Sequence, residues 1–413
     1  MSEYSYMQKK IVSLAITFAW PGYLKATGWH NRLKKYFQAK NNVADSINNT
    51  NWQCFNSERI MQSKKWVPAL YKKAVFSILL LASSFLSFSQ DLHFSQFFNS
   101  PLTTNPANTG FIPDADYRIG ANYRSQWVNI LNAPYKTMSI WGDAQVLRDR
   151  IPNGWLGIGG VILRDVAGSG NLTSTKVYGS LAYHQQVGLG SLLTAGFNAG
   201  WSNKRVDPSQ LKFPDQFNEA TGFFDAGVPT TAVFSTTSIS YLDLQAGLNY
   251  AYFPSDKVYV NAGFSVQHLN RPKESFFDNV SGYDNRLSPR YIGFLNASFK
   301  VNDQVIINPM AYYTNQAGAH ELVGGLNAHY NLSGDGDIQL IGGLYYRSGD
   351  AVIPMIGFQW KNLNISFTYD VTISTLSNYN NARGAIEFSI INQGVYAQYD
   401  GNKRQSWCPT FRN

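Results

Sequence analysis

The feature that most constrains this chain is an alternation of apolar and polar residues that recurs many times after residue 116. In 363–370, Leu, Ile, Phe and Tyr alternate with Asn, Ser, Thr and Asp, and 193–201 and 242–250 follow the same rule. An extended segment with this period has one apolar and one polar face. The pattern therefore predicts β-strands that lie between an apolar medium and a polar one.

Fourteen segments carry this pattern or can extend it, and their lengths of about 8 to 11 residues suit tilted strands that cross an outer membrane. An even number of strands returns both ends of the sheet to the same side of the membrane. We therefore predict an all-β protein, a transmembrane outer-membrane β-barrel of about 14 antiparallel strands within 117–391. The expected strands are 117–126, 137–147, 155–164, 175–184, 192–201, 241–251, 257–266, 290–300, 304–313, 321–330, 337–347, 351–360, 363–370 and 383–391.

The connections between these segments alternate in length, as they do in outer-membrane barrels, which have short periplasmic turns and long external loops. The long connections are 202–241, 267–289 and 371–382, whereas 252–256 and 361–362 are short. A soluble β-sandwich also has alternating strands. The length alternation and the leader described next favour the membrane barrel.

Residues 61–89 resemble a secretory signal peptide that lies inside the sequence. Four lysines precede an apolar run at 74–88, and small residues follow, so we expect cleavage between Ser89 and Gln90. A membrane anchor is the alternative, but about 15 apolar residues fall short of the roughly 20 that span a bilayer as a helix. We expect 1–60 to be an over-long reading of the gene or an unstructured leader.

The leader also accounts for the basic character of the chain. The formal net charge is +8, but residues 1–89 hold 12 Lys or Arg and 3 Asp or Glu, which leaves 22 and 23 for residues 90–413. The mature chain is therefore close to neutral, and nucleic acid is not an expected partner. Because 90–413 contains no run of 18 apolar residues, a helical membrane protein is excluded.

Few residues suggest catalysis or cofactor binding. None of the five histidines of the mature chain lies in a nucleophile motif, and no pair has metal-ligand spacing, so we expect no catalytic, cofactor or metal site. A hydrolase would require His268 with a nearby serine. The five histidines are His93, His184, His268, His320 and His329.

Charges of both signs occur at positions expected to face the lumen, where ion pairs across the barrel would close it. Glycines at 157–160 and 340–343 are expected where strands bend or where a segment in the lumen comes close. Residues 90–116 show no period and are expected to be irregular, as is the tail at 392–413. The lumen charges are Arg118, Arg124, Asp143, Asp243, Arg347, Asp370 and Glu387.

Several blocks resemble the PorP/SprF family of the type IX secretion system. They are DLHFSQFFNSPLTTNPANTGF at 91–111, YRIGANYRSQW at 117–127, LSPRYIGFLNASFK at 287–300, YDVTISTLSNYNNARGAIEFSI at 369–390, and the terminal Cys-Pro-Thr-Phe. The resemblance spans essentially all of 90–413, and its blocks occur in the family's order. Five residues in these blocks are expected to serve structure or partner contact: Asn105, Pro106, Tyr123, Arg124 and Trp127.

The resemblance implies an outer-membrane barrel component that is not an enzyme. SprF-like members support the export or surface attachment of a secreted adhesin, and PorP-like members join the secretion machinery. The expected partners are therefore an adhesin C-terminal domain or type IX components, together with outer-membrane lipid. A channel for a small solute is the alternative function.

Aromatic residues in the two longest loops are the expected partner contacts, because exposed aromatic side chains often anchor interfaces. Folding back over the barrel mouth as a lid is the alternative for each of them. The candidates are Phe223, Phe224, Phe234, Tyr241, Phe276, Phe277 and Tyr283.

Overall fold

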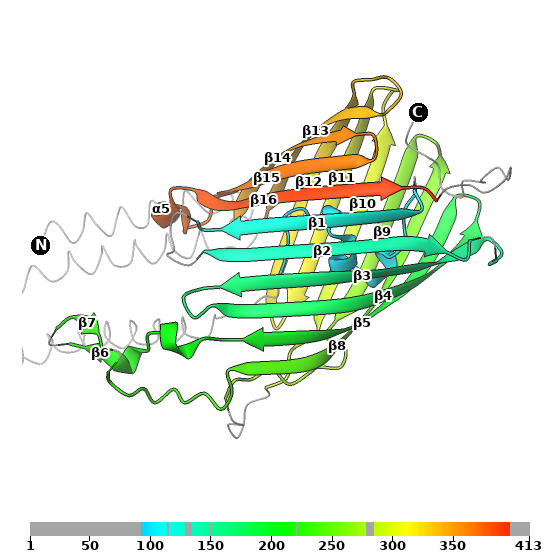
Figure 1. Cartoon of the computed structure of the whole chain (residues 1–413). Helices are drawn as coiled ribbons and strands as arrows, with labels where there is room; N and C mark the ends of the chain where they lie inside the picture. Colours follow the sequence, from blue (N-terminus) through cyan, green and yellow to red (C-terminus); the bar gives the residue numbers. More distant parts are fainter. Residues whose placement is uncertain are drawn as a thin grey trace, which may run out of the picture. The chain divides into compact units, whose positions relative to one another are not determined.

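The computed structural model describes residues 92–396, except 114, 129–133, 149, 220, 226 and 278–284. Fourteen antiparallel strands form a closed barrel in which each strand pairs with its neighbours in sequence and β1 pairs with β16 (Figure 1). The predicted fold is confirmed. The predicted leader, the cleavage site at Ser89 and Gln90, Tyr283 and most of the tail lie outside the described residues.

The strands of the barrel are β1 (Tyr117–Gln126), β2 (Tyr135–Val146), β3 (Gly154–Ala167), β4 (Leu172–Gly188), β5 (Ser191–Arg205), β8 (Ser238–Ser255), β9 (Val258–Gln267), β10 (Arg290–Lys300), β11 (Val305–Gln316), β12 (Ala319–Asn331), β13 (Ile338–Arg347), β14 (Ala351–Trp360), β15 (Leu363–Thr372) and β16 (Arg383–Gly394).

The predicted bounds of β1, β10 and β14 are those observed, and the other strands differ at one or both ends. The largest differences are in β4, β5 and β8, which are several residues longer than predicted. β16 also continues to Gly394, three residues into the expected tail, because Asn392, Gln393 and Gly394 pair with the first residues of β1.

The three longest connections lie at one end of the barrel, as predicted, but the lengths do not alternate throughout, because 317–318 and 348–350 at that end are shorter than 147–153 and 332–337 at the other. We call the end that carries 206–237, 268–289 and 373–382 the long-loop end, and the opposite end, with turns such as 189–190, the short-turn end. The long loops contain short elements that the sequence did not predict. These are η4 (Pro208–Gln210), η5 (Pro214–Gln216), the hairpin of β6 (Phe217–Asn218) and β7 (Phe223–Phe224), and α5 (Ser377–Asn380).

The outer face of the barrel is apolar. Large apolar side chains such as Ile140, Leu181 and Ile356, each about 60% exposed, alternate along the strands with buried residues. This band supplies the lipid-facing surface that an outer-membrane barrel requires. No helix among the described residues combines the length and apolar character needed to cross a membrane.

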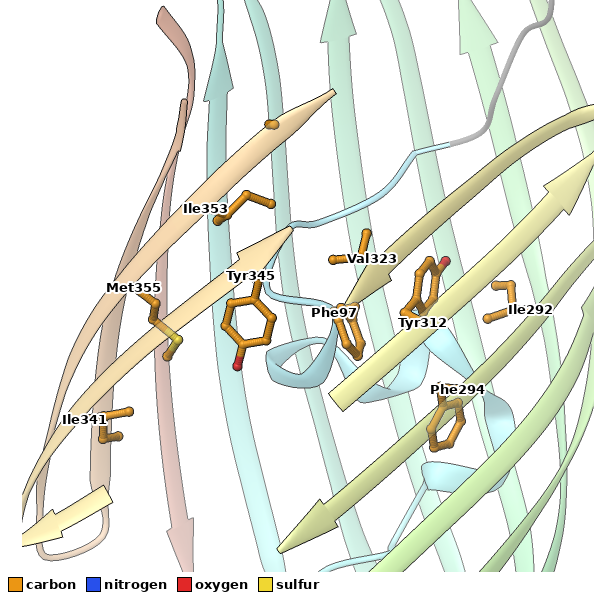
Figure 2. Packing of buried hydrophobic residues seen from close by; sticks show 10 residues of the cluster. Phe97, Ile292, Phe294, Tyr312, Val323, Ile341, Tyr345, Ile353 and Met355 are labelled. Carbon is orange, nitrogen blue, oxygen red and sulfur yellow. The ribbon is translucent and has the colours of Figure 1, made fainter. Parts of the chain in front are cut away.

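The lumen has a polar part and an apolar part. Buried Asn, Ser, Thr and charged residues face inward from strands all around the ring, and β10–β14 contribute an apolar cluster as well (Figure 2). Phe97 lies in this cluster, with its ring stacked on Tyr312 at 5.0 Å between centroids. Polar lumen faces were expected throughout. The lumen faces of β10–β14 are instead mixed, and their apolar part packs against Phe97 and Phe98.

Residues 92–116, which we call the lumen segment, lie within the ring of strands (blue in Figure 1). Most of them are buried, and they form three short turns rather than a strand or a long helix. The turns are η2 (Phe97–Asn99), α4 (Pro101–Thr104) and η3 (Pro106–Asn108).

Candidate functional site

The lumen segment passes from one end of the barrel to the other. The carbonyl of Leu92 accepts a hydrogen bond of 2.8 Å from Nη1 of Arg290, the first residue of β10, at the long-loop end. The N–H of Asp116 donates to the carbonyl of Gly394, the last residue of β16, at the short-turn end (2.8 Å). The chain therefore reaches β1 only after it has crossed the lumen.

Glycines of the barrel wall make room for the middle of this segment. A Cβ at Gly157 of β3 would overlap the carbonyl of Thr109, one at Gly196 of β5 would overlap the backbone of Pro106, and one at Gly247 of β8 would overlap the Asn105 amide. Larger side chains at these wall positions would displace the segment. The expectation that strand glycines mark the close approach of a lumen segment is confirmed at Gly157 but not at 340–343, where no lumen-segment atom is within contact of an added Cβ.

Asn105 and Pro106, two of the family-block residues, hold this contact. Asn105 is fully buried; its Oδ1 accepts from the N–H of Ala107 at the start of η3, and its Nδ2 donates to the Leu248 carbonyl (2.9 Å). Pro106 begins η3, where a missing N–H costs no hydrogen bond. In this structure both residues have a structural role.

An ionic cluster binds the first part of the segment near the long-loop end. We call Arg124, Arg347, Asp370 and Glu387, which come from four strands and are all less than 5% exposed, the latch. Arg124 pairs with Asp370 at 2.9 Å and with Glu387 at 3.1 Å, and Arg347 pairs with Asp370 at 2.9 Å. The predicted pairing of lumen-facing charges is found, but the pairs join strands that lie close together around the ring, from β13 to β1, and do not span the barrel.

The lumen segment completes the hydrogen bonding of the latch. The backbone N–H groups of Ser95 and Gln96 each donate to Glu387 at 2.8 Å. The Ser95 hydroxyl donates to Asp370 (2.9 Å) and accepts from Arg347 (2.6 Å). Because buried charges are costly unless they are paired and hydrogen-bonded, loss of the segment would leave these groups incompletely satisfied.

A second polar cluster fixes the segment near the short-turn end. Arg118 pairs with Asp143 at 2.8 Å, and Asp143 also accepts from the N–H of Gly110 at 2.6 Å. His184 lies against Trp155, with ring centroids 4.7 Å apart, and its Nε2 is 2.8 Å from the Thr109 carbonyl. Both ends of the segment are therefore bonded to the wall.

The histidines do not form an accessible catalytic site among the described residues. His268 Nδ1 is 2.9 Å from Asp243, which also accepts from the Tyr178 hydroxyl at 2.6 Å, but the side chains of His268 and Asp243 have no exposed area. A substrate could not reach them. No group of His, Cys, Asp or Glu in the described part of the chain has the geometry of a metal site.

His93 belongs to the lumen segment itself. Its Nε2 is 3.4 Å from a carboxylate oxygen of Glu321 on β12.

The two longest loops contact each other above the barrel and form what we call the loop platform, 206–237 together with 268–277 and 285–289. The N–H of Ser235 donates to the Phe276 carbonyl at 3.0 Å, and the rings of Phe234 and Phe277 have centroids 4.8 Å apart. The Tyr241 hydroxyl donates to Glu274 at 2.6 Å. The platform is therefore held by its own contacts.

The predicted partner-contact residues fall into two groups. Phe223 is 75% exposed, and Phe224 and Phe277 are about half exposed, so these three present aromatic surface at the long-loop end. Phe234, Phe276 and Tyr241 are half-buried and hold the platform together.

The remaining family-block residues lie at the same end of β1. Arg124 belongs to the latch, while Tyr123, its neighbour, faces outward and is 40% exposed. Trp127 ends the strand with φ 60°, donates its N–H to Gly384, and lies against Tyr135 at 5.1 Å between centroids. All three fit structural roles.

Sequence reasoning missed the lumen segment as a bonded element, and with it Ser95, Gln96 and Thr109. A usable signal was present in β14, whose almost continuously apolar sequence, Ala351–Trp360, departs from alternation and indicates apolar contacts on both faces. For the polar residues of the segment no comparable signal exists, because their partners are far away in sequence.

Comparison with known proteins gives one family. Residues 86–391 match the family described as Type IX secretion system membrane protein PorP/SprF. No curated protein matches the chain.

Solved structures of outer-membrane transporters are similar at low identity. They include the Ralstonia pickettii toluene transporter TbuX (13% identity, TM-score 0.43, covering 72% of this chain and 93% of that one) and the Pseudomonas putida toluene transporter TodX (12%, 0.43, 73% and 94%). A Pseudomonas aeruginosa FadL homologue gives 9% identity, a TM-score of 0.43, and coverage of 71% and 94%.

Proposed function

Since the chain belongs to the PorP/SprF family of type IX secretion system membrane proteins, we propose that this outer-membrane barrel binds a secreted, adhesin-type partner and supports its export or surface attachment. The C-terminal domain of such an adhesin is the expected binding element. Attachment to other components of the secretion machinery is the second form that this function can take. The barrel reaches the outer membrane after cleavage of a leader between Ser89 and Gln90, and its apolar band contacts lipid.

The observation that carries the proposal is the bonded lumen segment. Solute passage through the barrel requires a free path, whereas 92–116 crosses the lumen and is tied to the wall by the latch and by the wall glycines. A barrel filled in this way is suited to act through its surface. This favours a protein-binding role over a solute channel.

The loop platform supplies a surface for such a partner. Phe223, Phe224 and Phe277 expose aromatic rings there, and rings of this kind anchor many protein interfaces. Phe234, Phe276 and Tyr241 support the platform from within, and Tyr283 remains a predicted contact. Conversion of exposed rings to small polar side chains should therefore weaken binding without disturbing the barrel.

Affinity purification of the tagged barrel from native outer membranes tests the proposal. We expect a large secreted protein or type IX components to be retained by the wild type and by Tyr379→Ser, which changes an 81% exposed ring on another loop of the same end. The double variant Phe223→Ser/Phe277→Ser should retain at least tenfold less. N-terminal sequencing of the same sample should give Gln90.

The contrary outcome is also defined. A barrel that retains no protein partner and conducts small solutes in planar bilayers would refute the proposal and support the channel. Equal retention by the double variant and the wild type would remove the loop platform from the binding surface.

A further inference from the structure

A strand edge lies open beside the loop platform. β8 extends past the end of β9, so residues 238–245 pair with β5 on one side but have no ladder to β9 on the other. Leu242 and Leu244 are bonded on that side to 269–270, which leaves 238–241 without a paired strand. A groove of ≈ 450 Å³ runs along this edge. Its far wall is formed by the second loop of the platform, 268–277, and includes Lys273, Ser275 and Phe277.

Hydrogen bonds on either side of the groove show which backbone groups point into it. Thr236 donates its N–H to the Phe276 carbonyl, and the Leu242 carbonyl accepts from the Asn270 side chain. The backbone groups of the even-numbered residues therefore point toward the second loop, 268–277. The Thr237 carbonyl accepts from the N–H of Val206, so the backbone groups of the odd-numbered residues point toward β5. In an extended strand this parity continues from one residue to the next.

Ser238 and Ser240 therefore direct their backbone groups into the groove. Those of Ser238 are engaged by the Thr236 hydroxyl, at 3.2 Å to its N–H and 2.8 Å to its carbonyl. Within the described part of the chain, the N–H and C=O of Ser240 have no partner across the groove. An open edge of this kind is a template for another extended chain.

The charges that line the groove are unbalanced. Glu274 is held by Lys204 and by the Tyr241 hydroxyl. Lys273 is exposed and lies on the groove, and no carboxylate among the described residues is within ion-pair distance of its Nζ. The groove thus presents one cation together with an unused donor and acceptor of a strand edge.

We propose that an extended, carboxylate-bearing peptide segment of the secreted partner adds to the edge of β8 at Ser240 and places its carboxylate against Lys273. The inference rests on the proposed function and names the contact by which the partner is held. Strand addition uses backbone hydrogen bonds for affinity and neighbouring side chains for selection. The exposed ring of Phe277, on the same groove, contacts the apolar side chains of that segment.

The decisive variant is Ser240→Pro, and its matched control is Ser240→Ala. Proline removes the N–H that faces the groove but none that faces β5, and proline is tolerated at such edge positions. Alanine removes only the hydroxyl, which accepts from Asn203, and leaves the edge intact. We expect the proline barrel to retain at least tenfold less of the protein that co-purifies with the wild type, and the alanine barrel to match the wild type within twofold.

Two further measurements keep the test independent of folding defects. Lys273→Glu should lower retention at least fivefold while Lys273→Arg preserves it, and the loss should shrink in high salt, because exposed charges are screened. In the wild-type complex, hydrogen exchange of the 238–242 amides should slow relative to the stripped barrel. Heat-modifiable migration on gels verifies that each variant forms a barrel.

The outcomes separate this inference from the proposed function. If the wild type retains a partner, Phe223→Ser/Phe277→Ser loses it and Ser240→Pro keeps it, the strand addition is refuted while the function stands. If exchange at 238–242 is unchanged in a complex that does form, the inference is refuted as well. If no barrel, wild type included, retains any partner, both the strand addition and the proposed function are refuted.

Discussion

Alanine at Gly196 tests whether the wall glycines hold the lumen segment. A Cβ there would overlap backbone atoms of Pro106 and Ala107, which cannot rotate away as the end of a side chain would. Gly196 lies within β5, whose ladders to β4 and β8 run without interruption past this point. The lumen segment, rather than the wall, must therefore move.

The size of the effect follows from two contributions. An extra carbon in a filled interior costs about 1–3 kcal/mol. Displacement of Asn105 weakens its hydrogen bond to the Leu248 carbonyl, with a net loss of about 1 kcal/mol. Together they amount to about 2–4 kcal/mol, or roughly 30- to 700-fold in the equilibrium for release of the segment, since about 1.4 kcal/mol is a factor of ten.

Hydrogen exchange of 92–116 in detergent-solubilised barrels measures this equilibrium. The amides of the segment should exchange faster in Gly196→Ala, by the factor just given, while those of the barrel strands keep their protection. Gly342→Ala on β13 is the matched control, because a Cβ there meets nothing within 4 Å. Equal exchange of the segment in the wild type and both variants would refute the reasoning.

Two other changes address the same element. Arg124→Met leaves two buried carboxylates incompletely paired and should lower the free energy of unfolding by about 3–5 kcal/mol, measured as a lower urea midpoint. Arg164→Met, at an exposed position, is the control and should change the free energy of unfolding by no more than about 0.5 kcal/mol. Equal urea midpoints for the two variants would contradict this. Removal of 92–104 should raise conductance in planar bilayers above that of the intact barrel, and an unchanged conductance would show that the segment does not block the lumen.

The strands were predictable because lipid and lumen impose a period of two. β1, β10 and β14 were predicted at their observed bounds, although β14 is apolar on both faces. The prediction of β8 was three residues short at its start, where Ser238, Ile239 and Ser240 lie beyond β9 beside the loop platform. There the strand is defined by pairing with β5, and no lipid face selects its side chains.

The lumen segment could not be predicted as a docked element from its own residues. Its Asn, Ser and Thr side chains are equally typical of a solvated loop, and their partners on the strands lie far away in sequence, from 71 residues for Thr109 and Ser180 to 275 for Ser95 and Asp370. The charges of the latch were predicted to form ion pairs from their lumen-facing positions, although the pairs join neighbouring parts of the wall and do not cross the barrel. That Ser95 and Gln96 complete their hydrogen bonding required the folded arrangement.

The latch also connects docking of the segment to closure of the barrel. β1 and β16 are the first and last strands, and their pairing closes the ring at the largest sequence separation in the sheet. Arg124 of β1 and Glu387 of β16 pair with each other across this seam, and Glu387 accepts both backbone N–H groups of Ser95 and Gln96. Because long-range contacts must offset the entropy of ordering the intervening chain, the bonds of the segment stabilise the seam at the point where that entropy is greatest. The lumen segment is therefore part of what holds the barrel closed, and a partner that binds at the long-loop end meets a wall already fixed from within.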